Sequence, residues 1–202
     1  MPSRSFPGEH PAGATIQTWG GEAWTDGGGT GEDLQMLAEL LHAAVHVGAS
    51  VSFVLPFPVE QAYDYWRNRV APSVRAGDRR LLVARQEGAI AGTVQLILDM
   101  PPNQPHRAEV AKLLVHPRAR RQGIARALMG AVEDVARAEG RTLLTLDTRT
   151  GDAAEPLYLS MGYVLAGVIP RYARGPSGSG PEATSILYKE LSGDCSSTSL
   201  LR

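Results

Sequence analysis

The sequence lacks the features of several large protein classes. Its one cysteine, Cys195, lies in a polar tail, so an internal disulfide and a thiolate metal cluster are both excluded. No stretch approaches the roughly 18 apolar residues that cross a bilayer, and the first residues lack the apolar run of a secretory signal. A formal net charge of -1 argues against bulk nucleic-acid binding. We therefore expect a cytoplasmic protein with no metal site and no nucleic-acid or membrane partner.

The length and composition fit one globular domain with loose ends. Of 202 residues, 43% are hydrophobic and 20% charged, enough for one full core. Both ends are rich in Pro, Gly and Ser, which disfavours packing. We expect a flexible N-terminal extension over residues 1–30, a single domain over 31–191 and a flexible C-terminal tail over 192–202.

Hydrophobic periodicity and chain breakers predict a mixed α/β (α+β) fold. Apolar residues recur at helical spacing over 33–47, from Pro58 towards Pro72, over 124–138 and over 153–161. Extended patterns predict strands at 14–19, 80–85, 89–98, 107–115, 142–146, 163–169 and 184–191. The helix between strands 107–115 and 142–146 makes these two strands a right-handed parallel pair.

Residues 116–130, HPRARRQGIARALMG, place four arginines within nine positions between a strand and a helix. Unpaired amides and the helix dipole favour an anion there, and Gly123 lets it approach the backbone. The loop lacks the Lys-Ser/Thr of a P-loop and the extra glycines of a dinucleotide fingerprint. The alternative is a solvated basic helix start with a packing glycine. The preceding strand, the proline and the amphipathic helix together favour a pyrophosphate site.

The string LVHPRARRQGIA, followed some thirty residues later by LYLSMGY, resembles the GCN5-related N-acetyltransferases (GNAT). The resemblance implies a central, mostly antiparallel sheet with one parallel pair splayed around coenzyme A, flanking helices, and acetyl-CoA as co-substrate. Leu113, Leu114 and Val115 would lie along the pantetheine. The residues that would wrap the phosphates are Arg120, Arg121, Gln122, Gly123, Ile124, Ala125 and Arg126. Many members carry an asparagine where this chain has Gly151.

A narrower resemblance, to the tabtoxin resistance family, covers roughly residues 35–191. Its blocks are HVGASVSF (46–53), RAEVAKL (107–113), LLTLDT (143–148) and IPRYA (169–173). It implies an amino-acid-like toxin or antibiotic as the acceptor, and hence a detoxifying role.

Acetyl transfer needs a base, because amines are mostly protonated at neutral pH. Glu109 lies within an apolar strand, and strict alternation would place it on one face with Ala111, Leu113 and Val115, opposite Lys112. Asp147 ends the next parallel strand, where open sheets bind ligands. From the residues alone, a salt bridge of Glu109 with Arg107 and a turn cap by Asp147 stay open. The narrower resemblance implies substrate binding and proton transfer by this acidic pair.

Aromatic residues supply the other candidates. Tyr158 occupies the position where many family members use a tyrosine as the general acid towards the CoA thiolate; the alternative is core packing. Tyr65, Trp66 and Tyr172 are candidates for the acceptor pocket, with core packing as the equal alternative. Lys112 is interpreted as a strand lysine that either extends its ammonium to solvent (snorkelling) or pairs with an acidic residue, rather than as a catalytic residue.

These observations together predict an N-acetyltransferase that moves the acetyl group of acetyl-CoA to an amine of a small, amino-acid-like molecule by direct attack. Two alternatives stay open: transfer to a peptide or protein amine, and a non-catalytic acyl-CoA-binding module. The acceptor partner would be a small-molecule amine, and the chain a monomer or a homodimer.

Overall fold

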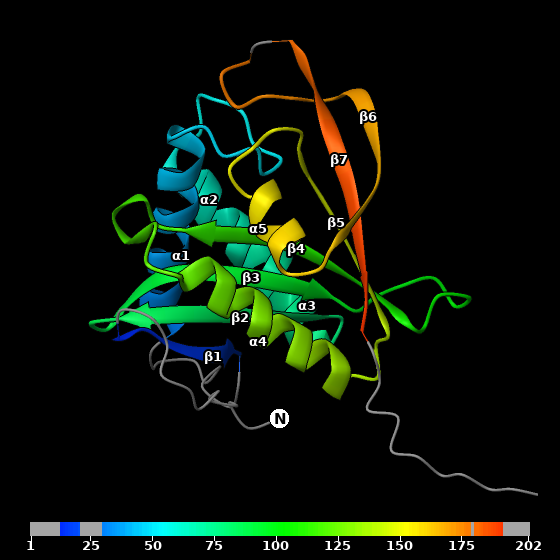
Figure 1. Cartoon of the computed structure of the whole chain (residues 1–202). Helices are drawn as coiled ribbons and strands as arrows, with labels where there is room; N and C mark the ends of the chain where they lie inside the picture. Colours follow the sequence, from blue (N-terminus) through cyan, green and yellow to red (C-terminus); the bar gives the residue numbers. More distant parts are fainter. Residues whose placement is uncertain (1–12, 21–29, 179, 192–202) are drawn as a thin grey trace, which may run out of the picture.

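The computed structural model describes residues 13–20, 30–178 and 180–191, in which seven strands form one mixed sheet between two layers of helices (Figure 1). The strand order is β1-β2-β3-β4-β5-β7-β6. The strands are β1 (Thr15–Trp19), β2 (Arg79–Gln86), β3 (Ala89–Ile97), β4 (Arg107–Val115), β5 (Leu143–Arg149), β6 (Val164–Arg174) and β7 (Pro181–Glu190). The α-helices are α1 (Thr30–His46), α2 (Val59–Tyr65), α3 (Ala71–Ala76), α4 (Ile124–Ala138) and α5 (Glu155–Ser160).

This architecture confirms the predicted fold class. Neighbouring strands pair antiparallel, except β4 with β5, which run parallel across the α4 crossover. The strand predicted at 14–19 is β1, which pairs with β2, so this part of the 1–30 segment belongs to the sheet. Residues 1–12 and 21–29 of the predicted N-terminal extension and the predicted C-terminal tail, 192–202, lie outside the described residues. No helix in the described part of the chain is long and apolar enough to cross a bilayer.

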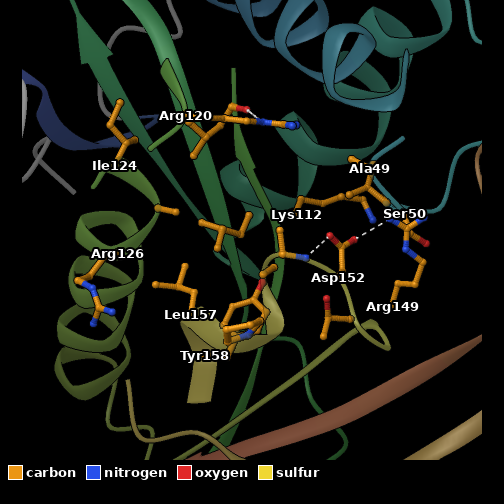
Figure 2. Close-up of a pocket in the computed structure, with 18 of the residues that line it drawn as sticks. Ala49, Ser50, Lys112, Arg120, Ile124, Arg126, Arg149, Asp152, Leu157 and Tyr158 are labelled. Carbon is orange, nitrogen blue, oxygen red and sulfur yellow. Dashed lines mark hydrogen bonds and ion pairs between the residues drawn. The ribbon is translucent and has the colours of Figure 1, made fainter. Parts of the chain in front are cut away.

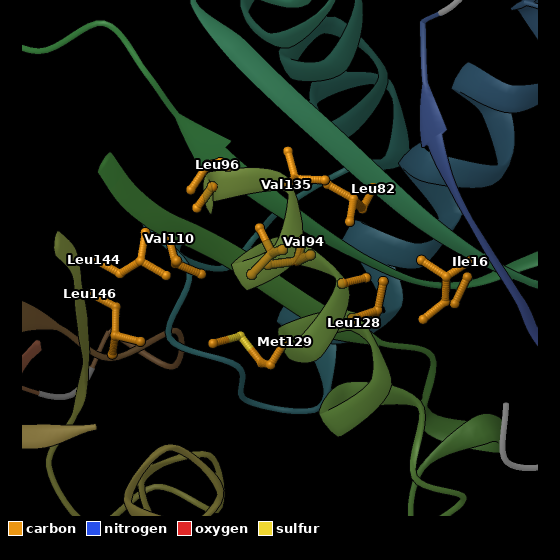
Figure 3. Packing of buried hydrophobic residues seen from close by; sticks show 14 of the residues in the cluster. Ile16, Leu82, Val94, Leu96, Val110, Leu128, Met129, Val135, Leu144 and Leu146 are labelled. Carbon is orange, nitrogen blue, oxygen red and sulfur yellow. The ribbon is translucent and has the colours of Figure 1, made fainter. Parts of the chain in front are cut away.

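Two hydrophobic clusters hold the layers together. The stripe of α4 packs on one face of the sheet, where Leu128, Met129 and Val135 meet Val94 and Val110 (Figure 3). Helices α1 to α3 pack on the other face. A Cβ added to Gly92 of β3 would lie 2.9 Å from the Leu114 carbonyl and 3.1 Å from Ile124 and Leu128, so this glycine lets α4 approach the sheet closely.

The predicted helix from Pro58 continues past Pro72, contrary to expectation. A π-helical turn, Trp66–Val70, joins α2 to α3, and the Ala71 amide donates to the Trp66 carbonyl. Proline has no amide hydrogen, and its ring collides with a carbonyl one turn back in an α-helix. The wider turn admits Pro72 within the first turn of α3, so the helical segment continues without a break.

Strands β4 and β5 separate partway along their length. Their parallel pairing runs from Arg107 with Leu143 to Glu109 with Thr145 and then stops, although β4 continues to Val115 and β5 to Arg149. The diverging halves leave a gap in the sheet directly before the start of α4. This gap positions the candidate site.

A β-bulge in β4 corrects the predicted alternation of side chains. Lys112 has φ +51°, and the register with β3 shifts between Thr93 and Gln95. Ala108 and Val110 therefore face α4 before the bulge, whereas Leu113 and Val115 face it afterwards. Glu109 consequently does not share a face with Leu113 and Val115, because one extra residue exchanges the two faces of the strand.

Candidate active site

A cleft of about 700 Å³ opens where β4 and β5 separate (Figure 2). Its walls are the bulged half of β4, the start of α4, the end of β5 with α5, and the loop after α1. The lining residues are Val47, Gly48, Ala49, Ser50, Val51, Ser52, Ala111, Lys112, Leu113, Val115, Ala119, Arg120, Arg121, Gly123, Ile124, Ala125, Arg126, Asp147, Thr148, Arg149, Asp152, Ala153, Ala154, Pro156, Leu157, Tyr158 and Ser160. Such a volume suits a small-molecule ligand.

One end of the cleft has the features of an anion site. The loop before α4 holds Arg121 at φ +64° and Gly123 at φ +80°, both left-handed. Gly123 is the N-cap of α4 and offers no side-chain cap, and the first turn contains no acidic residue. The first amides of α4 thus lack helical partners, and the helix dipole favours negative charge beside them. Arg120 and Arg126 add positive charge to the same wall.

The predicted coenzyme residues fall into two groups. All line the cleft except Leu114 and Gln122. Leu114 is buried on the opposite face of the sheet, because the bulge turns it towards α1. The Gln122 side chain accepts a hydrogen bond from Gln86 at 3.2 Å and donates to the Arg118 carbonyl at 3.4 Å. It therefore connects the loop to the end of β2 instead of lining the cleft.

Asp147 and Tyr158 both line the other end of the cleft. Asp147 is exposed near the end of β5, and among the described residues its carboxylate has no hydrogen-bond or ion-pair partner. Tyr158 is only 6% exposed. Burial raises the pKa of the Tyr158 hydroxyl well above its usual 10.0, and the nearby Asp152 and Asp147 carboxylates raise it further. Tyr158 therefore keeps its proton at neutral pH.

Glu109 lies at the point where the strands part, because its pairing with Thr145 is the last parallel contact. It is half-buried and does not line the cleft itself. Within the described chain, its carboxylate has no hydrogen-bond or ion-pair partner. The alternative salt bridge with Arg107 does not form, since that guanidinium bonds Gln104 and Thr145.

None of the three aromatic candidates for the acceptor pocket lines this cleft. Trp66 is fully buried in the cluster beneath α1. Tyr65 packs edge-on against Trp66 and Phe53, with its hydroxyl 3.5 Å from the Gln95 side chain. Tyr172 is exposed on β6. These positions favour core packing for Trp66 and Tyr65 and leave Tyr172 outside the cleft lining.

Several lining residues escaped sequence reasoning. Among them, Arg149 pairs with Asp152 at 3.2 Å, and Ser160 accepts a hydrogen bond at 2.6 Å from the predicted Arg126. Arg149 could have been found, because it follows Asp147 at the carboxyl end of the same strand. Ser52 lines the cleft through a contact with Lys112, sixty residues away, that no local pattern announces.

Comparison with known proteins places this geometry in a family. Residues 37–163, well over half of the chain, match the Acetyltransferase (GNAT) family. An uncharacterized N-acetyltransferase from the hisH-hisA intergenic region of Azospirillum brasilense is 37% identical over 127 residues, or 61% of this chain and 73% of that protein. The IAA acetyltransferase of the same organism is 33% identical over 115 residues, or 56% of this chain and 68% of that protein.

A solved structure supports the fold. The putative acetyltransferase yncA from Salmonella typhimurium, whose structure includes acetyl-CoA, superposes with a TM-score of 0.66. The superposition covers 93% of this chain and 99% of that one, at 16% sequence identity.

Proposed function

This chain belongs to the Acetyltransferase (GNAT) family, and we propose that it transfers the acetyl group of acetyl-CoA to the amine of a small, amino-acid-like molecule. The family membership makes it an acetyl-CoA-dependent acetyltransferase with acetyl-CoA as its co-substrate. The acceptor class and a role in detoxifying a toxin or antibiotic rest on the resemblance to the tabtoxin resistance family. A cytoplasmic location and a monomeric or homodimeric state belong to the same proposal.

The observation that carries the proposal is one cleft lined both by the arginine-rich loop before α4 and by Asp147 and Tyr158. The residues fit the coenzyme: left-handed backbone at Arg121 and Gly123 precedes the open amides of α4, which suits a pyrophosphate. Leu113 and Val115 on β4 would lie along the pantetheine. When bound, acetyl-CoA supplies an acetyl group activated as a thioester.

The chain's own groups would move the protons. The Asp147 carboxylate, open to the cleft and unpaired within the described residues, is placed to take a proton from the acceptor ammonium. Glu109, set back where the strands part, would act on the same proton through a water. The Tyr158 hydroxyl, kept protonated by burial, would donate to the departing thiolate sulfur. Positioning of both reactants contributes by making the attack effectively unimolecular.

The test is acetyl-CoA consumption with a panel of amino acids, amines and peptides. We expect turnover on small amino-acid-like amines, with kcat lowered about 100-fold or more in Asp147→Asn and by a smaller factor in Glu109→Gln. Asp134→Asn is the matched control, because Asp134 is an exposed carboxylate on α4, paired with Arg137. Its rate should equal that of the wild type.

The same panel of acceptors distinguishes the proposed function from the two alternatives, a peptide or protein acetyltransferase and a non-catalytic acyl-CoA-binding module. Turnover on peptides alone would replace the proposed acceptor class. Tight acetyl-CoA binding without turnover on any amine would identify a binding module. Wild-type rates in both acidic variants would remove Glu109 and Asp147 from the mechanism.

A further inference from the structure

Charged side chains of both signs meet where β4 and β5 part, and they do not pair with one another. Lys112 feels the charges of Asp147, Glu109 and Arg79. Among the described residues, none of these four groups has an ion-pair partner within 4.0 Å. Lys112, Glu109 and Arg79 are partly buried, and a partly buried charge without an opposite charge lowers the stability of a folded protein unless a ligand supplies that charge.

Lys112 is the cation that faces the cleft. It lines the cavity, and its Nζ donates to the Ser52 hydroxyl at 3.0 Å, its one bond within the described chain. Figure 2 shows its side chain running from β4 towards the loop that carries Ala49 and Ser50. Burial lowers the pKa of the Lys112 ammonium, the charge of Asp147 opposes this, and Arg79 adds to the lowering. An anion at this place would relieve the desolvated charge.

The backbone at Lys112 adopts a conformation that is unfavourable in free energy. Both Lys112 (φ +51°) and Ser52 (φ +73°) are non-glycine residues in the left-handed region, and their side chains bond to each other. Such conformations are unfavourable by about 1 kcal/mol or more each and concentrate at ligand sites. A lysine that only packed against the strand would extend its amine to solvent instead.

A second cation lies behind the first. The Arg79 guanidinium bonds the amide oxygen of Gln95, which is fully buried, and the Arg79 Nε is buried without a hydrogen-bond partner in the described residues. Gln95 is neutral, so the charge of Arg79 is not cancelled. Arg79 thus strengthens the positive potential on this side of the cleft, opposite in sign to that of Asp147 and Glu109.

We propose that Lys112, held by Ser52, binds a carboxylate of the acceptor, while the acceptor ammonium faces Asp147 and reaches Glu109 only through a water. The site then takes a zwitterion, with an anionic group recognised at the β4 bulge and the amine presented to the base. The inference rests on the proposed acetyl transfer and adds its specificity determinant. It makes Lys112 a binding residue for the acceptor rather than for the coenzyme.

The experiment compares matched acceptors that differ only in the carboxylate: ornithine with putrescine, lysine with cadaverine, and tyrosine with tyramine. In the wild type, each amino acid should be the better substrate. Lys112→Met should raise the KM of the amino acid about 10- to 100-fold, the value of a hydrogen bond between charged groups. The KM of the decarboxylated amine and that of acetyl-CoA should change less than threefold, or about 0.7 kcal/mol.

Two variants serve as controls. Lys112→Arg keeps the charge and should restore most of the preference for the carboxylate. Arg67→Gln removes one positive charge from an exposed position on the π-helical turn, away from the cleft, and should change neither KM. Equal losses on both members of each pair in Lys112→Met, or a raised KM for acetyl-CoA, would overturn the proposal.

A failure of the proposed function has a different signature, because no member of any pair would then be acetylated by the wild type. Titration calorimetry of the same pairs against the CoA-bound protein decides the role of Lys112 in that case. Preferential binding of the amino acids that disappears in Lys112→Met supports the carboxylate site. Equal binding of both members refutes it.

Discussion

Replacing Gly123 with alanine should separate backbone binding of the coenzyme from charge attraction. Gly123 has φ +80° at the N-cap of α4, a conformation that costs a residue with a Cβ about 1–2 kcal/mol. The loop can relieve this strain by rotating away from the left-handed region. The amides at the start of α4 would then no longer converge, and losing one or two hydrogen bonds to a charged phosphate weakens binding by about 2–4 kcal/mol.

The matched control lies at the other end of the same helix. Gly140 has φ +70°, no atom within 4 Å of an added Cβ, and no place in the cleft lining. Gly140→Ala should therefore carry the same backbone strain of about 1–2 kcal/mol in the free energy of unfolding. Its affinity for acetyl-CoA should stay within a factor of two or so of the wild type.

Titration calorimetry with acetyl-CoA and urea unfolding measure the two effects. We expect Gly123→Ala to raise the Kd at least about 30-fold, and Arg121→Gln by about 10-fold or less, with the arginine effect shrinking at high salt. The reasoning would be refuted if Gly140→Ala lost as much affinity as Gly123→Ala. It would also be refuted if Arg121→Gln were the more damaging of the two changes in the loop.

Three further predictions concern the acid, the core and a buried ion pair. Tyr158→Phe should lower kcat about 10- to 100-fold while leaving the KM of acetyl-CoA nearly unchanged. Above about pH 10, the free energy of unfolding of the wild type should fall by up to about 1.4 kcal/mol per pH unit from this group, because the folded state keeps a proton that the unfolded state releases. The variant lacks this hydroxyl, so its free energy of unfolding should fall less over the same pH range. Gly92→Val should destabilise the fold by about 1–3 kcal/mol in urea titrations, since its side chain would press on the Leu114 carbonyl and on α4; an unchanged unfolding midpoint would contradict the close packing. Lys189→Met should cost about 1–3 kcal/mol because the 5% exposed Glu133 loses its bond at 2.7 Å and keeps only the longer pairing with Arg137 at 3.7 Å. Combining it with Glu133→Leu should recover part of that loss, and additive losses would argue against the buried pair.

Much of the scaffold was predictable because its signals are local. The apolar stripe of α4, the proline that ends β4 and the crossover to β5 all act within a few residues along the chain. The loop around Gly123 was predictable for the same reason, since a strand, a basic loop and a helix start follow one another directly. The resemblance to a known family then supplied the roles proposed for Asp147 and Tyr158, which both line the cleft.

The sequence by itself determined the order of the elements, the parallel pair and the basic, glycine-containing loop that leads into α4. Only the tertiary structure decided which side chains meet in the cleft. One extra residue at Lys112 exchanges the faces of β4, so Glu109 lies apart from Leu113 and Lys112 reaches Ser52. Bulges and contacts between distant segments depend on strand register and packing, which leave no periodic trace in the local sequence. The same packing buries Trp66 and leaves the charges at the β4–β5 opening without ion-pair partners in the described chain.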